Sequence, residues 1–472
     1  MTKPTTSRRD ILKLGAAAIA APTVLPASVL GRDGATPPSE TVRVGLIGCG
    51  GRATLVREGA DVPGFQVVAV ADCLKERAVN FSNQHSGGKW PAYEDFRQMI
   101  DAEQLDGVMV ETTTHARAWI AIHAMQMGMD AYIEKPMALT ISEGRAMVDA
   151  ARALQRVTQV GTQQRSMPIN NWASDLVKNG AIGKIKAVLA PNFIGPFEWQ
   201  GASTVEPGDK VDPWWDVWTN QAELRPYDPQ LHLGWARWRA YDSGGLCFGV
   251  SGWGAHSYDQ ILRAIGADET GPVEVLLEEE VAVRDSGRFA PQETVGGVAL
   301  GATGDHLTGD LDTGADYYSM AKLAGPRGKV RLTMANGTEL RMHLDGDRGP
   351  GLGAIFVGEH GKIEINRNKV ASNPKELVRG SNNPGPNTRP ETSYHIENWV
   401  NCIKTRERCN ADIEYGQRAN SLCELVNIAR HVGLVGVPLK WDPAAERFTN
   451  SDEANAMLSR PRRAGWELPE VG

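Results

Sequence analysis

The chain has 472 residues, 41% of them hydrophobic, and a formal net charge of −7. This is the composition of an ordinary globular protein, and no basic run beyond the first residues and the short Arg460–Arg463 stretch indicates nucleic-acid binding. The six cysteines lack the spacing of a metal site or a dense disulfide framework, so we expect no metal.

The first 40 residues are typical of an export signal followed by a linker. The first residues are basic and include the pair Arg8-Arg9, and an alanine-rich apolar run from Leu14 to Leu30 follows them. The paired arginine predicts export by the twin-arginine machinery to a periplasmic or extracytoplasmic location. A retained membrane anchor is the alternative, but Pro22 and Pro26 interrupt the run, and a spanning helix needs ~20 unbroken apolar residues.

A glycine loop follows the first predicted strand, Val42–Ile47. The segment Gly48-Cys49-Gly50-Gly51-Arg52-Ala53 fits G-x-G-x-x-A, in which Gly48 allows a tight turn and Gly50 lets the backbone approach a pyrophosphate. The helix expected next offers free N–H groups to the phosphates. We therefore assign Gly48, Gly50, Gly51 and Arg52 to cofactor binding.

An acidic residue ends the second predicted strand, Gln66–Ala71. Asp72 lies 24 residues after Gly48, where a carboxylate accepts hydrogen bonds from a ribose 2′-hydroxyl and repels a 2′-phosphate. We therefore predict NAD, with NADP less favoured. A glycine turn with a surface aspartate is the alternative.

Strand and helix signals continue in alternation. We predict strands over Gly107–Val110 and Asp130–Ile133 and a helix over Ala118–Gly128 between them. This β-α-β pattern predicts a parallel sheet with helices on both faces, and we place the Rossmann domain over residues 41–162.

The strand Asp130–Ile133 is followed by Glu134-Lys135-Pro136, at the edge where open α/β sheets bind ligands. A lysine in such a crevice can help to move a proton. A solvated lysine before a turn proline is the alternative, and the spacing alone does not decide between them.

Four segments in chain order resemble the glucose–fructose oxidoreductase, inositol dehydrogenase and MocA (Gfo/Idh/MocA) family. They are Gly48 to Arg52, Glu134 to Pro136, Gly161-Thr162-Gln163-Gln164-Arg165-Ser166 and Gly254-Ala255-His256-Ser257-Tyr258-Asp259. The resemblance implies a second domain with a large, mostly antiparallel open sheet that is often used for oligomerisation. It also implies that Lys135 and His256 are catalytic residues beside the nicotinamide, and that Thr112, His115 and Glu134 join Lys135 in the cofactor site.

Two departures from the family pattern stand out. Gly252 takes the place of an aspartate that would share a helix face with His256 and assist proton transfer. The stretch Thr112 to Arg117 is altered as well. A plain alcohol dehydrogenase mechanism is therefore less secure than the overall resemblance.

After residue 162 the pattern changes, and we predict an α+β substrate and oligomerisation domain over 163–445, followed by a tail over 446–472. The expected strands are Ala187–Ile194, Val273–Val283, Tyr317–Leu323, Lys329–Met334 and Glu339–Leu344. The pair Asn336-Gly337 predicts a hairpin. The segment Arg379–Pro390 is expected as a loop, and helices are expected over His395–Lys404 and Gln417–Arg430.

Eight of the thirteen tryptophans fall between residues 172 and 253, interleaved with charged side chains. Such a mixture suits stacking on a sugar, although tryptophans are also common core and interface residues. The residues assigned to the substrate are Lys135, Arg165, Tyr241, Trp253, His256 and Asp259. A satisfied core histidine is the alternative for His256, and a junction role is the alternative for Arg165.

The predicted function is that of an NAD-dependent oxidoreductase acting on a hydroxyl of a sugar, cyclitol or glycoside, as a homo-dimer or homo-tetramer. Because free NAD is scarce outside the cytoplasm, an exported enzyme must hold its NAD tightly and recycle it internally. A redox-neutral, NAD-dependent glycoside hydrolase is one alternative. A catalytically inactive, NAD-holding binding protein is another.

Overall fold

The computed structural model describes residues 37–201, 205, 210–245, 249–284, 325–344, 351–379 and 382–471. Residues 1–41 and 42–472 form two separate units. Most of the predicted leader lies outside the described residues, and the described part of the first unit holds a single 3₁₀ turn, η3 (Pro38–Glu40). Within these ranges, no helix combines the length and the apolar character that crossing a membrane requires.

The first domain is a six-stranded parallel sheet in the order β3-β2-β1-β4-β5-β6. Its strands are β1 (Val42–Ile47), β2 (Phe65–Ala71), β3 (Ala92–Tyr93), β4 (Gly107–Val110), β5 (Asp130–Ile133) and β6 (Thr158–Val160). Its helices are η4 (Gly51–Gly59), α2 (Lys75–Ser86), α3 (Phe96–Ala102), α4 (Thr114–Gln126) and α5 (Ile141–Ala153). The predicted Rossmann fold is confirmed, because this is the strand order of dinucleotide-binding sheets.

Burial explains why these strands read as apolar runs. All residues of β4 and β5 are buried, as expected for a parallel sheet that is covered on both faces. The helix predicted over Ala118–Gly128 begins earlier, at Thr114, because Thr113 has the extended backbone of an N-cap. It ends at Gln126, and Gly128 follows with a left-handed φ of +90°.

The second sheet has nine strands in the order β15-β14-β13-β7-β12-β11-β8-β16-β17. They are β7 (Ile185–Pro191), β8 (Pro272–Leu277), β11 (Val330–Met334), β12 (Glu339–Leu344), β13 (Ala354–Gly358), β14 (Lys362–Asn366), β15 (Lys369–Asn373), β16 (Leu439–Asp442) and β17 (Arg447–Phe448). Among the described strands of this second sheet, β7 and β12 are the only neighbours that pair in parallel, and all other neighbours are antiparallel. The predicted mostly antiparallel sheet is therefore confirmed. The predicted hairpin joins β11 to β12, with Thr333 opposite Glu339 and Gly337 at φ +83°.

Two strand predictions need correction. The single strand expected over Val273–Val283 is two strands, β8 and β9 (Ala282–Arg284), because the chain leaves the sheet at the acidic residues Glu278–Glu280. β9 pairs with β10 (Gly325–Arg327) in a separate two-stranded sheet. The strand expected over Ala187–Ile194 starts and ends earlier, as β7, and its register with β12 shifts near Pro191. The strand expected over Tyr317–Leu323 lies outside the described residues.

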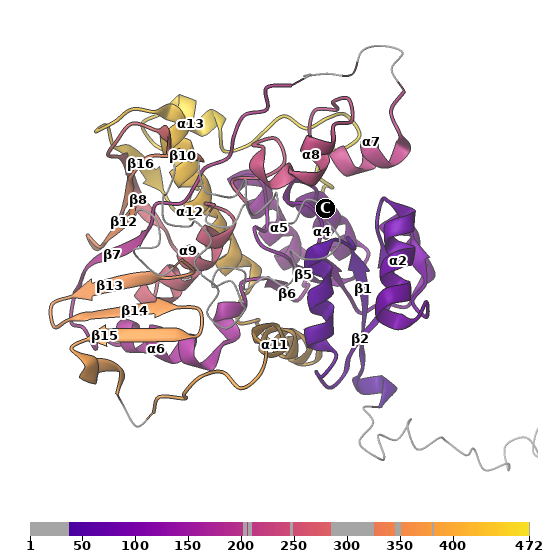
Figure 1. Cartoon of the computed structure of the whole chain (residues 1–472), viewed down its shortest axis with the longest axis horizontal. Helices are drawn as coiled ribbons and strands as arrows, with labels where there is room; N and C mark the ends of the chain where they lie inside the picture. The colour runs from indigo at the N-terminus through magenta and orange to yellow at the C-terminus, as the bar shows by residue number, and fades with distance from the viewer. Residues whose placement is uncertain are drawn as a thin grey trace, which may run out of the picture. The chain divides into compact units, whose positions relative to one another are not determined.

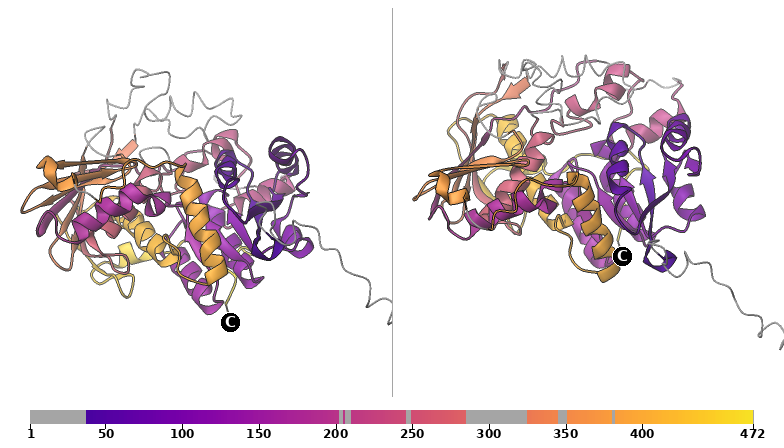
Figure 2. Two further views of the ribbon diagram at one scale, coloured as in Figure 1. Left: turned by 90° about the horizontal axis from the view of Figure 1, so that it is seen from below. Right: turned by 60° about the horizontal axis from the view of Figure 1, so that its bottom comes forward.

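The remaining helices pack on the second sheet, on the first domain or between them. They are η5 (Gln163–Ser166), α6 (Pro168–Lys178), α7 (Pro213–Thr219), α8 (Pro229–Leu233), η6 (Trp235–Arg237), α9 (Trp253–Ile265), η8 (Lys375–Val378), α11 (Glu391–Thr405), α12 (Ile413–Val432) and α13 (Asp452–Ala456). Helix α12 packs on α9, on α5 and on strand β8, and it therefore joins the two sheets (Figure 1). Figure 2 shows β13, β14 and β15 as the orange edge of the second sheet.

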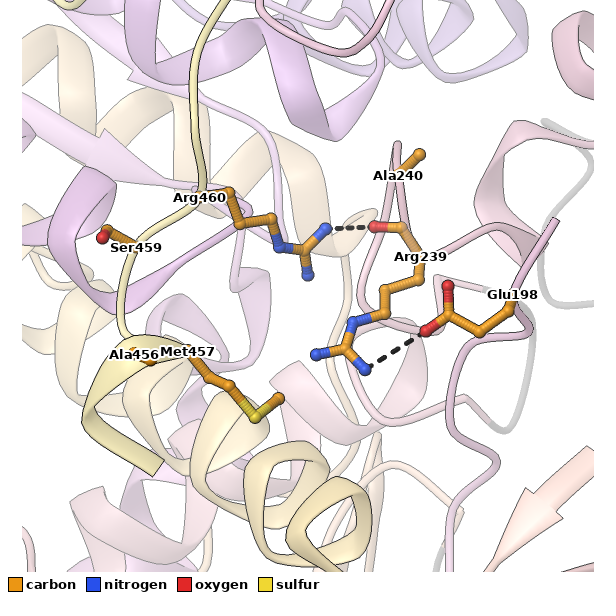
Figure 3. Close-up of a pocket in the computed structure, with 7 residues that line it drawn as sticks. All are labelled: Glu198, Arg239, Ala240, Ala456, Met457, Ser459 and Arg460. Atoms are coloured by element: carbon orange, nitrogen blue, oxygen red, sulfur yellow. Dashed lines mark hydrogen bonds and ion pairs between the residues drawn. The ribbon is translucent and has the colours of Figure 1, made fainter. Parts of the chain in front are cut away.

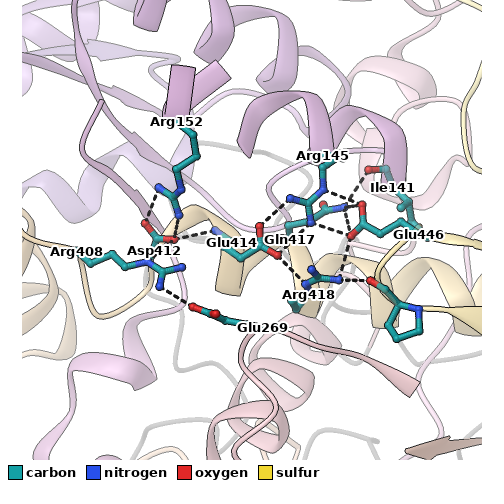
Figure 4. Close-up of polar contacts among 11 residues, drawn as sticks. Ile141, Arg145, Arg152, Glu269, Arg408, Asp412, Glu414, Gln417, Arg418 and Glu446 are labelled. Atoms are coloured by element: carbon teal, nitrogen blue, oxygen red, sulfur yellow. Dashed lines mark hydrogen bonds and ion pairs between the residues drawn. The ribbon is translucent and has the colours of Figure 1, made fainter. Parts of the chain in front are cut away.

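An ion-pair network also joins the domains (Figure 4). Arg145 of α5 contacts Glu414 at 2.7 Å and Glu446 at 2.9 Å, and Arg418 of α12 binds the same two carboxylates. The C-terminal tail returns to the first domain as well, where Trp466 lies 5.1 Å from Trp119 between ring centroids. The junction that carries the site is therefore held by contacts from several elements.

Candidate active site

Two glycines of the loop differ in the space that surrounds them: Gly48 has no room for a side chain, whereas Gly50 has free space beside it. Gly48 has φ +92°, and a Cβ atom there would lie 2.9 Å from backbone atoms of Glu111 and Thr112, so only glycine fits. At Gly50 no heavy atom lies within 4 Å of the position that a Cβ would take. Helix η4 starts directly afterwards, at Gly51, without a side-chain cap on its free N–H groups. This open, uncapped loop fits the pyrophosphate of a dinucleotide.

Asp72 lies beside this loop, at the end of β2. Its carboxylate accepts hydrogen bonds from the backbone N–H groups of Cys49 and Leu74, both at 2.9 Å. These bonds fix the carboxylate at the loop, where an adenosine ribose would be bound. The residues present therefore fit NAD, with Gly48, Gly50, Gly51 and Asp72 as its holders.

Glu134 and Arg52 form the floor of the site. The Glu134 carboxylate is buried and lies 2.6 Å from Arg52 Nε. Burial alone would raise the pKa of Glu134, but Arg52 and Lys135 hold it below its usual range. Gln163 Nε2 donates to the same carboxylate at 3.3 Å, and a Cβ at Gly161 would lie 2.6 Å from it, so a larger residue there would displace Glu134.

Lys135 and His256 come from different domains, and Lys135 lies close enough to His256 for its charge to lower the His256 pKa. Lys135 Nζ donates to the carbonyl of Gly252 at 3.2 Å, and His256 lies in the first turn of α9 with 4% exposure. Burial, and then the cations Arg367 and Lys135, lower the pKa of His256 well below its usual value. His256 is therefore neutral near pH 7, and the same burial and cations oppose its protonation.

The expectation that residues 252 and 256 share a helix face is wrong. Gly252 precedes α9 as its N-cap, with φ −76° and ψ −90°, so it has no place on a face of the helix. What this position gives to the site is its backbone carbonyl, which binds Lys135.

Three further residues contact the site and were not assigned to it from the sequence. Glu111 directly follows β4, beside Gly48, and burial with Glu134 nearby raises its pKa to about 8. Asp242 is fully buried and accepts hydrogen bonds from Thr114 at 2.5 Å and Ser251 at 2.6 Å. The acidic residue after a buried strand could have indicated Glu111, whereas nothing in the local sequence distinguishes Asp242.

The third missed residue is Arg367, in the turn after β14. Its Nη2 lies 3.2 Å from His256 Nε2 and 3.4 Å from Nδ1, and its Nη1 lies 2.9 Å from Glu391. No pattern around Arg367 predicts this contact, because the two residues are far apart in the sequence.

Arg165 and Asp259 form a buried ion pair. Arg165 Nε lies 2.7 Å from Asp259, and its Nη2 lies 2.8 Å from Asp268. Burial raises the pKa of Asp259 to about 6, against the opposing effect of Arg165. The geometry favours the junction role for this pair, and their assignment to substrate, like that of the half-buried Trp253, stays a prediction.

His115 and Tyr241 lie inside an aromatic cluster that we define by its buried members Trp215, Trp218, Leu231 and Tyr241. His115 Nε2 contacts the carbonyl of Trp218 at 2.7 Å, and its ring centroid is 4.9 Å from that of Tyr241. Both side chains have 0% exposure. Both residues are therefore part of the protein interior. Neither has exposed surface with which to contact a ligand, so the burial does not support His115 as a cofactor residue or Tyr241 as a substrate residue.

The same cluster changes the interpretation of the tryptophans. Trp199, Trp214, Trp235 and Trp238 pack against it, and several of these rings stack or meet edge to face. Packing therefore accounts for most of this tryptophan-rich segment. The cluster also contacts Cys73, directly after Asp72, and thus lies at the cofactor edge of the first sheet.

A surface pocket of about 290 Å³ lies elsewhere (Figure 3). It is lined by Glu198, Arg239, Ala240, Ala456, Met457, Ser459 and Arg460. An ion pair of 3.2 Å joins Arg239 to Glu198, and none of the predicted site residues lines this pocket. Among the described residues no group of three or more His, Cys, Asp or Glu side chains could hold a metal.

Sequence comparison identifies the class of protein. Residues 42–162 match the oxidoreductase family with an NAD-binding Rossmann fold, and residues 318–468 match the C-terminal alpha/beta domain of that family. The chain therefore belongs to the Gfo/Idh/MocA oxidoreductase family, and the predicted family and its NAD cofactor are confirmed.

Several curated relatives are similar over part of the chain. Scyllo-inositol 2-dehydrogenase (NAD(+)) of Bacillus subtilis is 30% identical over 26% of this chain and 35% of its own length. D-apiose dehydrogenase of Paraburkholderia graminis is 33% identical over 29% and 36%. A glycosyl hydrolase family 109 protein of Porphyromonas gingivalis is 30% identical over 26% and 28%. The chain thus matches less than half the length of each of these relatives.

Solved structures share the fold at low identity. Aldose-aldose oxidoreductase from Caulobacter crescentus, complexed with glycerol, has a TM-score of 0.53 and 18% identity over 85% of this chain and 99% of its own. An oxidoreductase from Agrobacterium radiobacter, in complex with NAD+, L-tartaric acid and magnesium, has a TM-score of 0.53 and 15% identity over 84% and 98%.

Proposed function

We propose that the protein is an NAD-dependent oxidoreductase that acts on a hydroxyl group of a sugar, cyclitol or glycoside. The observation that carries the proposal is the approach of Lys135 and His256 at the sheet edge that bears the glycine loop. Relatives named as scyllo-inositol and D-apiose dehydrogenases support the substrate class. When bound, NAD would accept a hydride from the carbon that carries the hydroxyl.

The residues of this chain handle the proton. Lys135, with neutral His256 beside it, takes the hydroxyl proton, and the positive charge that Lys135 gains stabilises the negative charge that develops on the oxygen. Gly252 holds Lys135 in position through its carbonyl. Glu134 and Arg52 form an ion pair next to Lys135, and this ion pair holds both side chains in place.

The leader adds a proposal about location. The paired Arg8-Arg9 supports export through the twin-arginine pathway, after folding in the cytoplasm. An exported enzyme has little free NAD available, so we propose that NAD stays bound and is reoxidised within each cycle. The open nine-stranded sheet supports a homo-dimer or homo-tetramer.

Redox-neutral glycoside hydrolysis is the second candidate, and relatives named as glycosyl hydrolase family 109 proteins favour it. In such a reaction bound NAD would take a hydride at a ring hydroxyl and later give it back, so no external oxidant would be consumed. Between these two events the neighbouring C–H proton would be lost, the glycosidic group would leave by elimination, and water would add to the double bond.

One experiment separates these proposals. Purified protein is denatured, and the released nucleotide is identified by mass spectrometry. Intact protein is then given 4-nitrophenyl glycosides without added NAD. Release of nitrophenol without accumulation of NADH indicates the hydrolase, and accumulation of NADH with an oxidised sugar indicates the dehydrogenase. Protein that contains no NAD and takes up none would contradict both.

A further inference from the structure

Arg367 places a second cation directly against the catalytic histidine. Its side chain is 14% exposed, and its Nη2 lies 3.2 Å from His256 Nε2. A group bound at His256 is therefore within reach of this guanidinium. Arg52 is also close enough to affect the pKa of both His256 and Arg367.

The guanidinium of Arg367 is only partly satisfied. Nη1 pairs with Glu391 at 2.9 Å, whereas Nε is buried and has no hydrogen-bond partner among the described residues. Nε and Nη2 form one edge of the planar guanidinium, in which Nη2 contacts the His256 ring and Nε has no partner in the described part of the chain. Such an edge can bind a carboxylate through two parallel hydrogen bonds. A buried donor without a partner calls for an explanation, and a ligand is one.

We propose that the substrate carries a carboxylate close to the reacting hydroxyl, and that the Nε–Nη2 edge of Arg367 binds it. The substrate class is then a sugar acid or the glycoside of one. This inference rests on the proposed function, because it concerns the same site.

The surrounding charges favour a carboxylate over a phosphate. Glu391 lies against Arg367, and Glu134 lies against Arg52, so each arginine already has one acidic neighbour. A singly charged, planar group matches the Nε–Nη2 edge of Arg367 and would share Nη2 with His256. A phosphate dianion would meet stronger repulsion from the two glutamates.

Stabilisation of an alkoxide is the competing explanation for Arg367. In that case the arginine would assist neutral and acidic sugars alike, because the developing charge is on the reacting oxygen of both. The carboxylate proposal instead predicts a difference between matched sugars.

The test compares 4-nitrophenyl β-D-glucuronide with 4-nitrophenyl β-D-glucoside, and glucuronate with glucose and glucose 6-phosphate. A charge-assisted contact predicts that kcat/KM for the acid exceeds that for the neutral sugar by about 10- to 150-fold. Arg367→Met should bring this ratio close to one. Arg367→Lys should retain part of it, because the charge stays but the two-pronged edge is lost.

Arg389→Met is the matched control. Arg389 is a partly exposed arginine that pairs with Glu397 at 2.7 Å, and its loss should leave the ratio unchanged. Thermal shifts of the wild-type protein with glucuronate and with glucose measure binding without turnover, and they need no variant to fold.

Equal use of acidic and neutral sugars would overturn the proposal, as would an acid preference that survives in Arg367→Met or a stronger preference for glucose 6-phosphate. If no sugar is turned over but glucuronate alone stabilises the protein, and does so only with Arg367 present, the proposed reaction fails and the carboxylate site stands. If neutral sugars react without acid preference, the reaction stands and this inference fails. A protein that neither binds nor converts any acid refutes the inference.

Discussion

Two glycines of one loop should respond in opposite ways to the same substitution. At Gly48, alanine would have to adopt φ +92° and would bring its Cβ to 2.9 Å from the backbone of Glu111 and Thr112. Left-handed backbone alone costs about 1–2 kcal/mol, and backbone atoms cannot move aside as a side chain can. Gly48→Ala should therefore lower the melting temperature by several degrees.

At Gly50 the same methyl group meets nothing. The backbone there is extended, with φ −79°, and no heavy atom lies within 4 Å of the Cβ position. Gly50→Ala should therefore leave the nucleotide-free protein as stable as the wild type, or raise its stability by about 0.4–1 kcal/mol. The methyl group would instead occupy space that the cofactor needs, and overpacking of about 1–3 kcal/mol corresponds to roughly 5- to 150-fold weaker NAD binding.

Thermal denaturation of nucleotide-free protein and calorimetric titration with NAD measure the two effects separately. Gly48→Ala should show a stability defect, and Gly50→Ala should show a binding defect without a stability defect. A Gly50→Ala protein that binds NAD as tightly as the wild type would refute the placement of the pyrophosphate at this loop.

Three further outcomes follow from the site. Asp72→Ser should weaken NAD binding by about 10-fold or more and reduce the preference for NAD over NADP. Titration with both nucleotides measures these effects, and an unchanged preference would show that Asp72 does not bind the ribose. Lys135→Met should keep its NAD content but lose about 10²–10⁴ in turnover, and retained turnover would exclude Lys135 from proton transfer. Glu111 has its pKa raised to about 8, so between pH ~4.5 and 8 the folded protein holds a proton that the unfolded chain releases, and stability falls as pH rises through this window. Glu111→Gln should flatten this fall in urea denaturation from pH 5 to 9, and an equally steep fall would contradict the raised pKa.

The sequence was sufficient to predict the site residues that directly follow an apolar strand. Gly48, Gly50 and Asp72 follow buried parallel strands, and the order of strands then brings their ends to one edge. Glu134 and Lys135 could be placed for the same reason. The strand boundaries of β1, β4 and β5 were predicted correctly because their apolar runs are fully or nearly fully buried.

Contacts between distant segments could not be predicted in this way. Arg367 reaches His256 from a turn of the second sheet, and its role depends on where β14 and α11 place it. The tryptophan-rich segment was misleading for a related reason. Its composition suits a sugar site and a packed cluster equally well, and only the ring contacts around Trp215 and Trp218 distinguish the two.

The most direct test of the account follows absorbance at 340 nm after freshly purified protein, freed of unbound nucleotide, is mixed with a panel of neutral and acidic sugars. At least one sugar should produce an absorbance rise of no more than one NADH equivalent per site, or, for a glycoside, product release with full recovery of the oxidised cofactor. Lys135→Met, with the same nucleotide content, should give neither response. A protein that contains bound NAD and yet shows neither response with any sugar would contradict the proposed chemistry.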